Sequence, residues 1–155
     1  MKLDSIDRRL LEILQANAEV PVAELAAQVH LSPTPCWRRV QRLKEAGVIT
    51  KQVALVDPRQ VNVAVTVFVA VRTSQHTPKW FNNFRAVVQA IPEVVEFYRM
   101  SGDVDYLLRI VVPDIAAYDT VYQRLINGTA LSDVSSSFAM EELKFTTALP
   151  LSYAL

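Results

Sequence analysis

The sequence predicts an α+β protein in two parts, with helices at the N-terminal end followed by elements in the order β-α-β-β-α-β. Two observations predict this class. Apolar residues recur at helical spacing before Gly47, whereas valines occupy every second position from Val61 to Val71, which is the period of a strand. The glycines and all eight prolines lie at expected starts, ends or connections of elements, so the local signals agree with one another.

The length and composition exclude several classes of protein. A chain of 155 residues with 51% hydrophobic residues can form one domain or two small ones and is too apolar to be disordered. A single cysteine excludes an internal disulfide and a cysteine-based zinc site. Together with the lack of a signal sequence at the start of the chain, the single cysteine also predicts a cytoplasmic protein. No apolar run approaches the ~20 residues of a membrane helix, so no membrane partner is expected.

The charge is distributed unevenly although its sum is zero. Residues 1–60 carry nine basic and seven acidic side chains, and residues 61–155 carry seven and nine. We place a domain boundary near residue 60, where Asp57 and Pro58 predict a turn. The front part is mildly basic, and four of its nine basic side chains are concentrated in one stretch, from Leu31 to Gly47.

Three helices are expected in residues 1–60. Asp4 can cap the first, which ends at Asn17 and Ala18, and a second covers about residues 22–29 without a good side-chain cap. After a tight turn at His30, a third helix runs to Gly47. Their expected buried stripes are Ile6, Leu10, Ile13 and Leu14, then Leu25, Ala26 and Val29, then Cys36, Val40 and Leu43.

The third helix has the strongest functional signal. Ser32 is expected to cap it with its hydroxyl, and Pro33 and Pro35 fit its first turn. Two short helices, a turn and a basic third helix form a helix-turn-helix, whose third helix reads the major groove of DNA. The residues expected to contact DNA are Ser32, Thr34, Pro35, Trp37, Arg38, Arg39, Arg42 and Lys44. Extended residues 48–55 would form a small wing beside this helix.

Less specific interpretations of the third helix remain open at this point. A basic helix face is often only solvated. Trp37 either touches DNA or packs against a neighbouring helix. Cys36 lies on the buried stripe, which favours a small core residue over a thiol sensor.

Residues 61–155 are expected to form the β-α-β-β-α-β domain, a split ferredoxin-like plan. The first strand is apolar on both faces, so we expect helices on one face and a partner subunit on the other. Thr77 and Asp114 can cap the two helices. The expected elements are a strand at 61–71, a helix from Pro78 to Ile91, strands at 94–100 and 105–112, a helix from 115 to Asn127–Gly128, and a strand at 134–144. The tail at 145–155 is expected to be extended or weakly ordered.

Several stretches of the chain resemble one family. LDSIDRRLLEILQ, LSPTPCWRRVQRL, AGVI and GDVDYLLRIVV are similar to segments of the Lrp/AsnC transcription regulators, in the same order and over nearly the whole chain. TPCW, VALVDP, PEVVEFYRM, LSDVSSSFAM and FTTALP most resemble the cysteine-responsive branch of that family. The resemblance implies a winged helix-turn-helix domain at 1–60 and a βαββαβ effector-binding and oligomerisation domain at 61–155.

The resemblance also implies the partners and an effector site. Its partners would be double-stranded DNA, a small amino acid such as cysteine, and copies of itself in a homodimer that assembles to an octamer, with no cofactor. The residues expected at the effector site are Met100, Gly102, Asp103, Val104, Asp105, Ser135, Ser136 and Ser137. Two departures concern this site: position 104 is often aromatic in the family and is Val here, and residues 127–130 lack the usual Pro-Gly pair.

Two other readings compete with an amino-acid-responsive regulator. From residue type alone, Asp103 and Asp105 fit a solvated hairpin as well as an ammonium-binding site. No glycine-rich phosphate loop, HExxH or nucleophile elbow is present, so we expect no enzyme, and the two histidines have no partners at metal-ligand spacing. The alternative is an architectural DNA-binding protein that needs no ligand.

Overall fold

The computed structural model describes residues 2–154, which form two compact units. The first unit consists of the chain up to Ala54 together with the C-terminal residues from Lys144 onward. The second unit is Leu55–Leu143. The prediction of one boundary near residue 60 did not include this return of the C-terminal residues to the first unit.

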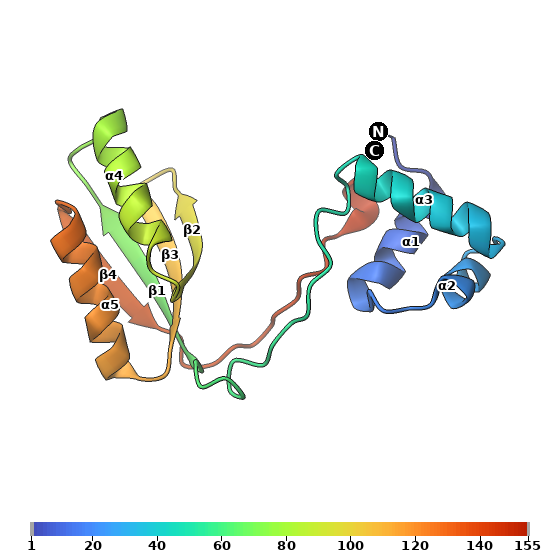
Figure 1. Ribbon diagram of the computed structural model, residues 1–155. Helices are drawn as coiled ribbons and strands as arrows, with labels where there is room; N and C mark the ends of the chain where they lie inside the picture. Colours follow the sequence, from blue (N-terminus) through green and yellow to red (C-terminus); the bar gives the residue numbers. More distant parts are fainter. Residues whose placement is uncertain (1, 155) are drawn as a thin grey trace. The chain divides into compact units, whose positions relative to one another are not determined.

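The first unit contains the three expected helices, α1 (Ser5–Ala16), α2 (Val22–Gln28) and α3 (Pro33–Glu45) (Figure 1). Asp4 and Asp7 form a reciprocal capping box that satisfies backbone N–H groups at the start of α1. No side chain caps α2, as the sequence suggested. The predicted apolar stripes meet in one core made by Leu10, Ile13, Leu25, Ala26, Val29, Cys36 and Val40.

The expected wing is not a strand in this structure. Residues 48–55 follow α3 without strand pairing in the described part of the chain, and the Val48 and Ile49 N–H groups still donate to the Leu43 carbonyl of the helix. Ile49 packs against the helical core, but Val53 and Leu55 are 67% and 65% exposed. A ribbon needs a second strand to satisfy its backbone groups, and residues 2–54 and 144–154 supply none.

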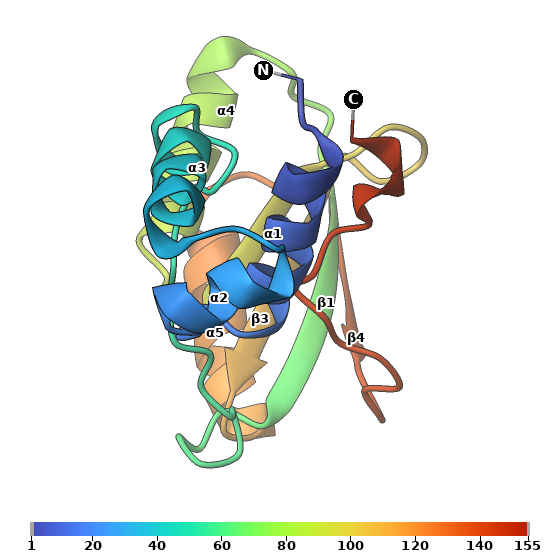
Figure 2. The same cartoon turned by 90° about the vertical axis from the view of Figure 1, so that its right-hand side faces the viewer.

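The C-terminal segment was expected to be extended or weakly ordered, and this expectation did not include the contacts that it makes with α1. A short 3-10 helix, η1 (Leu151–Tyr153), lies beside α1 (Figure 2). The Gln15 side chain accepts a hydrogen bond from the Leu149 N–H at 2.7 Å and donates one to the Leu149 carbonyl at 3.2 Å. Arg8 also donates to the Ala154 carbonyl at 3.4 Å. These long-range bonds could not be read from local sequence signals.

The second unit has the predicted β-α-β-β-α-β order. Its elements are β1 (Val65–Arg72), α4 (Pro78–Gln89), β2 (Val94–Arg99), β3 (Tyr106–Val112), α5 (Ile115–Gly128) and β4 (Asp133–Phe138). The four strands form one antiparallel sheet in the order β2-β3-β1-β4. Thr77 and Asp114 cap α4 and α5 as expected.

The sheet has one covered face and one open face. Both α4 and α5 lie on the same face (Figure 1), where Val67, Val69 and Val71 of β1 are fully buried against aromatic side chains such as Phe84. Phe68 points to the other face and is 40% exposed. The second unit therefore buries one side of a strand that is apolar on both sides.

Two strand ends differ clearly from prediction. The strand expected from Val61 begins at Val65, because Pro58–Asn62 forms a turn in which Asn62 has φ +59°. The strand expected to end at Lys144 ends at Phe138. The helix α5 ends at Gly128, as predicted, and a Cβ there would approach Val87 of α4 to 2.8 Å, so close helix packing explains the glycine.

Candidate DNA interface and effector site

The outward face of α3 carries the residues that were expected to touch DNA. Trp37 is 52% exposed and so is not packed in the core, and Arg38 and Lys44 are exposed as well. Neither cation makes an ion pair with an acid among residues 2–154. These two basic side chains are therefore available to a polyanion without breaking a contact inside the protein.

Arg39 and Arg42 are instead held by acids of α1. Asp7 is 1% exposed and accepts hydrogen bonds from both guanidinium groups at 2.8–2.9 Å. Arg39 also donates to Asp4 at 2.6 Å, and this bond lowers the pKa of the Asp4 carboxyl below its ordinary value. The expected contact of Arg39 and Arg42 with DNA stays a prediction; in the structure both side chains bind acids at the start of α1.

The start of α3 departs from the expected capping. Ser32 occupies the N-cap position, yet its hydroxyl makes no capping hydrogen bond. The usual donors are the backbone N–H groups two and three positions later, and Pro35 at the third position has none. The first turn of the helix is exposed at Ser32, Thr34 and Pro35. The Ser32 hydroxyl is therefore open to solvent and makes no capping hydrogen bond.

The hairpin between β2 and β3 contains the predicted effector loop. The Met100 N–H donates to the Asp105 carbonyl at 2.8 Å, and the Asp105 N–H donates to Val71 of β1 at 3.0 Å. Gly102 has φ +99°, a conformation that disfavours any residue with a Cβ. Exposed Met100 and half-buried Val104 flank this turn. The loop is thus fixed to the end of β1 by its backbone.

The two aspartates of this loop have different surroundings. Asp105 accepts a hydrogen bond from the Thr73 N–H at 2.8 Å, so part of its hydrogen-bonding capacity is used to hold the chain after β1. The Asp103 carboxylate is exposed and makes no hydrogen bond within the described chain. Asp103 is therefore the better candidate for an ammonium group, a distinction that residue type alone could not make.

The three serines of β4 do not share a face. Ser135 and Ser137 lie opposite Ala70 and Phe68 on the open face of the sheet. Ser136 lies on the helix face, where its hydroxyl is hydrogen-bonded to Tyr118 of α5. Burial raises the pKa of the Tyr118 hydroxyl above its ordinary value. The strand's period of two separates Ser136 from the other two predicted ligands.

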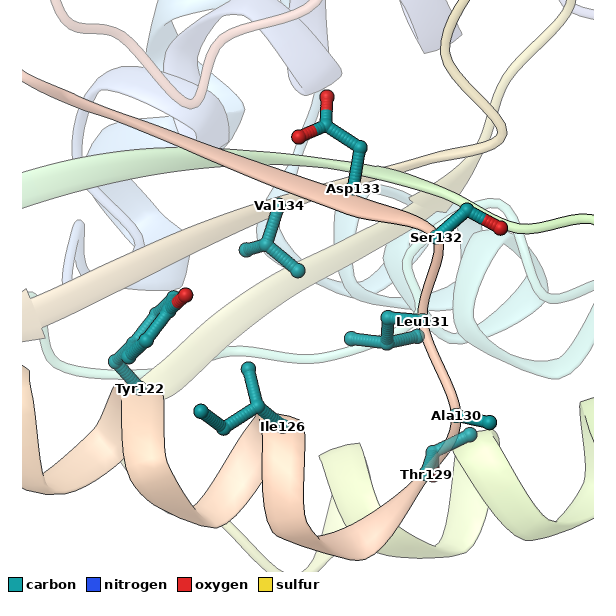
Figure 3. Close-up of a pocket in the computed structure, with 8 residues that line it drawn as sticks. All are labelled: Tyr122, Ile126, Thr129, Ala130, Leu131, Ser132, Asp133 and Val134. Atoms are coloured by element: carbon teal, nitrogen blue, oxygen red, sulfur yellow. The ribbon is translucent and has the colours of Figure 1, made fainter.

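A hollow of about 400 Å³ opens between the end of α5 and the start of β4 (Figure 3). Figure 3 shows the side chains of Ile126, Leu131 and Val134 pointing toward one another, with the Tyr122 ring beside them, whereas the Asp133 carboxylate points away. The hollow contains none of the predicted effector residues, and its apolar side chains belong to the helix face.

Arg72 contacts both the loop at residues 100–105 and the start of β4, which hold the predicted effector residues. The sequence did not predict a role for Arg72. It is the last residue of β1, and its Nε donates to the Asp103 carbonyl at 2.8 Å. Its Nη1 lies 3.6 Å from Asp133 Oδ2 on β4. A basic residue at the end of a valine-rich strand was the only signal in the sequence.

Three further features bear on function. Burial raises the pKa of the Cys36 thiol, which fits the expected inert core residue. No cluster of three or more metal-ligating side chains occurs among residues 2–154. Within the same residues, no helix has both the length and the apolar character needed to cross a membrane.

A helix-turn-helix with a basic outer face, joined to a sheet domain with a charged loop at one end, defines a DNA-binding regulator with a ligand-binding module. Comparison with known proteins agrees. Residues 3–44 match the AsnC-type helix-turn-helix domain, and residues 66–149 match the Lrp/AsnC ligand binding domain. The chain belongs to the Lrp/AsnC family of transcriptional regulators, as the sequence resemblance implied.

Similar proteins extend over the whole chain. The DNA-binding transcriptional activator DecR of Escherichia coli (strain K12) is 46% identical over 96% of this chain and 99% of its own. The crystal structure of an AsnC family regulator from Agrobacterium tumefaciens matches with a TM-score of 0.96 and 59% identity, covering 99% of this chain and 100% of that one.

A third similar protein was solved with a ligand. A Neisseria meningitidis transcriptional regulator in complex with L-Met matches with a TM-score of 0.92 and 35% identity, over 97% of this chain and 98% of that one. These comparisons confirm the predicted fold class, and the relatives are regulators of transcription rather than enzymes.

Proposed function

We propose that this regulator is a homodimer whose DNA binding responds to a small α-amino acid, with cysteine as the first candidate. The ligand-binding domain and the neighbouring structure with L-Met support an amino-acid effector. Cysteine rests on the sequence resemblance to the cysteine-responsive branch of the family alone. We also propose that these dimers assemble into an octamer, and only the family resemblance supports this part.

The open face of the sheet is the observation that supports a dimer. Phe68 and Tyr98 are exposed large hydrophobic residues, 40% and 51% exposed, and Leu107 and Val111 lie near them on the same face of the sheet. Burying apolar surface stabilises an association by about 25 cal/mol per Å² before its entropic costs are counted. A second copy of the same face provides a matching surface through a two-fold axis.

The dimer proposal is tested by sedimentation at micromolar concentration. Phe68→Lys places a charge at the centre of the open face, and we expect it to shift the protein from dimer to monomer. Ile115→Lys is the matched control, because Ile115 is 70% exposed on α5, away from the open face. A well-folded wild-type monomer under these conditions would contradict the proposal.

The arrangement of the loop carries the effector proposal. Residues 100–105 are anchored to the end of β1, which also pairs with the start of β4. Asp103 can receive an ammonium group there, and Ser135 or backbone N–H groups can donate to a carboxylate. The ligand alters DNA binding only if its affinity differs between two assembly states of the protein.

Calorimetry with cysteine, methionine and other amino acids tests this site. Asp103→Asn should weaken the binding of the best ligand by about 2 kcal/mol, roughly thirtyfold in Kd, because a charged hydrogen-bond partner is lost. Asp119→Asn removes the same charge from an exposed position on α5 and should leave the Kd unchanged. Binding of no amino acid, with DNA binding intact, would favour the architectural alternative.

A further inference from the structure

Arg72 has the geometry of a ligand-binding cation with spare capacity. A guanidinium offers five N–H donors in a planar fork. In Arg72 the Nε donor is used at 2.8 Å on the Asp103 carbonyl, and Nη1 is only loosely paired with Asp133 at 3.6 Å. The Nη2 donors make no hydrogen bond with any residue from 2 to 154, and the side chain is 53% exposed.

The position of Arg72 suits an α-amino acid in particular. Such a ligand carries an ammonium and a carboxylate on one carbon, so its site needs an acid and a base side by side. Arg72 donates a hydrogen bond to the backbone carbonyl of Asp103, and the side-chain carboxylate of the same Asp103 is free. No other basic side chain described in residues 55–143 hydrogen-bonds to this loop or to β4.

We propose that the Arg72 guanidinium binds the carboxylate of the amino-acid effector. In the free protein this guanidinium is paired with the Asp133 carboxylate, which the ligand carboxylate displaces on binding. The inference rests on the proposed amino-acid response and assigns the anion-binding half of that site. The Arg72–Asp133 pair is suited to exchange, because both side chains are more than half exposed and the pair is long. Ser135 lies on the same face of β4, two residues beyond Asp133, and can donate a further hydrogen bond.

Two ligand series separate this role from a purely structural one. Calorimetry is done on the full chain with L-methionine and L-cysteine, and with the amides of both, which keep the ammonium but have no carboxylate. The wild type should prefer each acid to its amide. Arg72→Gln should weaken binding of the acids at least about tenfold and leave the amides nearly unchanged. Arg72→Lys, which keeps a charge but not the fork, should fall between them.

Two further variants complete the design. Asp133→Asn removes the competing carboxylate and should strengthen binding of the acids without affecting the amides. Arg85→Gln removes an exposed cation from α4 and should change neither series. Circular dichroism tests whether each variant is folded. If Arg72→Gln does not fold, the comparison of acids with amides is made on Arg72→Lys instead.

The outcomes distinguish this inference from the function on which it rests. Equal losses for acids and amides in the Arg72 variants would show that Arg72 only holds the loop, and would overturn the inference while leaving an amino-acid response in place. No loss in either series would also overturn it. A wild type that binds no amino acid would remove the proposed function and this inference together.

Discussion

Asp7 is a buried carboxylate that combines two roles, a helix cap and an acceptor for two arginines. It closes the capping box of α1, it is 1% exposed, and it accepts hydrogen bonds from both Arg39 and Arg42 of α3. A buried carboxylate is tolerated only when it is paired and hydrogen-bonded, and these two guanidinium groups provide that. The same pairs fix where α3 sits against α1.

Asp7→Asn should therefore lower the free energy of unfolding by about 1–3 kcal/mol, since the arginines would lose their charged partner. Urea unfolding at neutral pH measures this change. Glu12→Gln is the control on the same helix, because its pair with Arg9 has both side chains more than half exposed and should contribute below about 0.5 kcal/mol. Equal effects of the two substitutions would refute the role given to Asp7.

The stability contributed by Asp4 should depend on pH. Its pKa is lower in the folded protein than the ordinary 3.8, mainly because Arg39 donates to it. A lowered folded-state pKa stabilises the fold above the unfolded value, and this contribution is lost as the pH falls through the folded value. Unfolding curves of wild type and Asp4→Asn should thus differ at pH 7, begin to converge below pH 3.8 and coincide only below the lower pKa of the folded state. A difference that did not shrink with acid would contradict this assignment.

At the scale of elements, local signals predicted most of the fold. Thr77 and Asp114 located two helix starts, and alternating valines located β1, because capping and strand period depend only on neighbouring residues. The misses required long-range information. The serines of β4 are separated by a register that pairs Ser136 with Val69, and the basic face of α3 is partly occupied by acids more than thirty residues away.

The sequence did not predict the contacts of the C-terminal segment with α1, and these contacts yield a prediction. Gln15 holds Leu149 by two hydrogen bonds, so Gln15→Ala should speed hydrogen exchange of the Leu149 amide and reduce stability by about 1 kcal/mol. Gln28→Ala, at an exposed position in α2, is the matched control. Exchange at Leu149 that is equally fast in wild type and Gln15→Ala would contradict the docking of this segment.

At the scale of the whole molecule, each unit has its own core and its own task. A two-fold dimer would present two copies of α3, so we expect an imperfect palindromic DNA site with half-sites about one helical turn apart. Binding would then depend on pairs of equivalent contacts, which amplifies the effect of one substitution.

Arg38 and Lys44 should contribute differently to that binding. Arg38 lies near the N-terminal end of α3, where base edges are read, and Arg38→Ala should cost about 1–3 kcal/mol and relax preference at one base pair. Lys44→Ala should weaken all sequences evenly and flatten the salt dependence by about one unit per site. Binding measured on a set of operator variants at two salt concentrations separates the roles. A uniform loss in Arg38→Ala would contradict its assignment to a base.

The two tryptophans happen to be divided between the units. Trp37 stands 52% exposed on α3, whereas Trp80 is 7% exposed in the sheet domain, where its indole N–H donates to the Ala130 carbonyl at 3.0 Å. An exposed indole emits at longer wavelength than a buried one. The intrinsic fluorescence of the unlabelled protein therefore has two separable components, one expected to respond to DNA at α3 and the other to rearrangement where α4 meets the chain leading into β4.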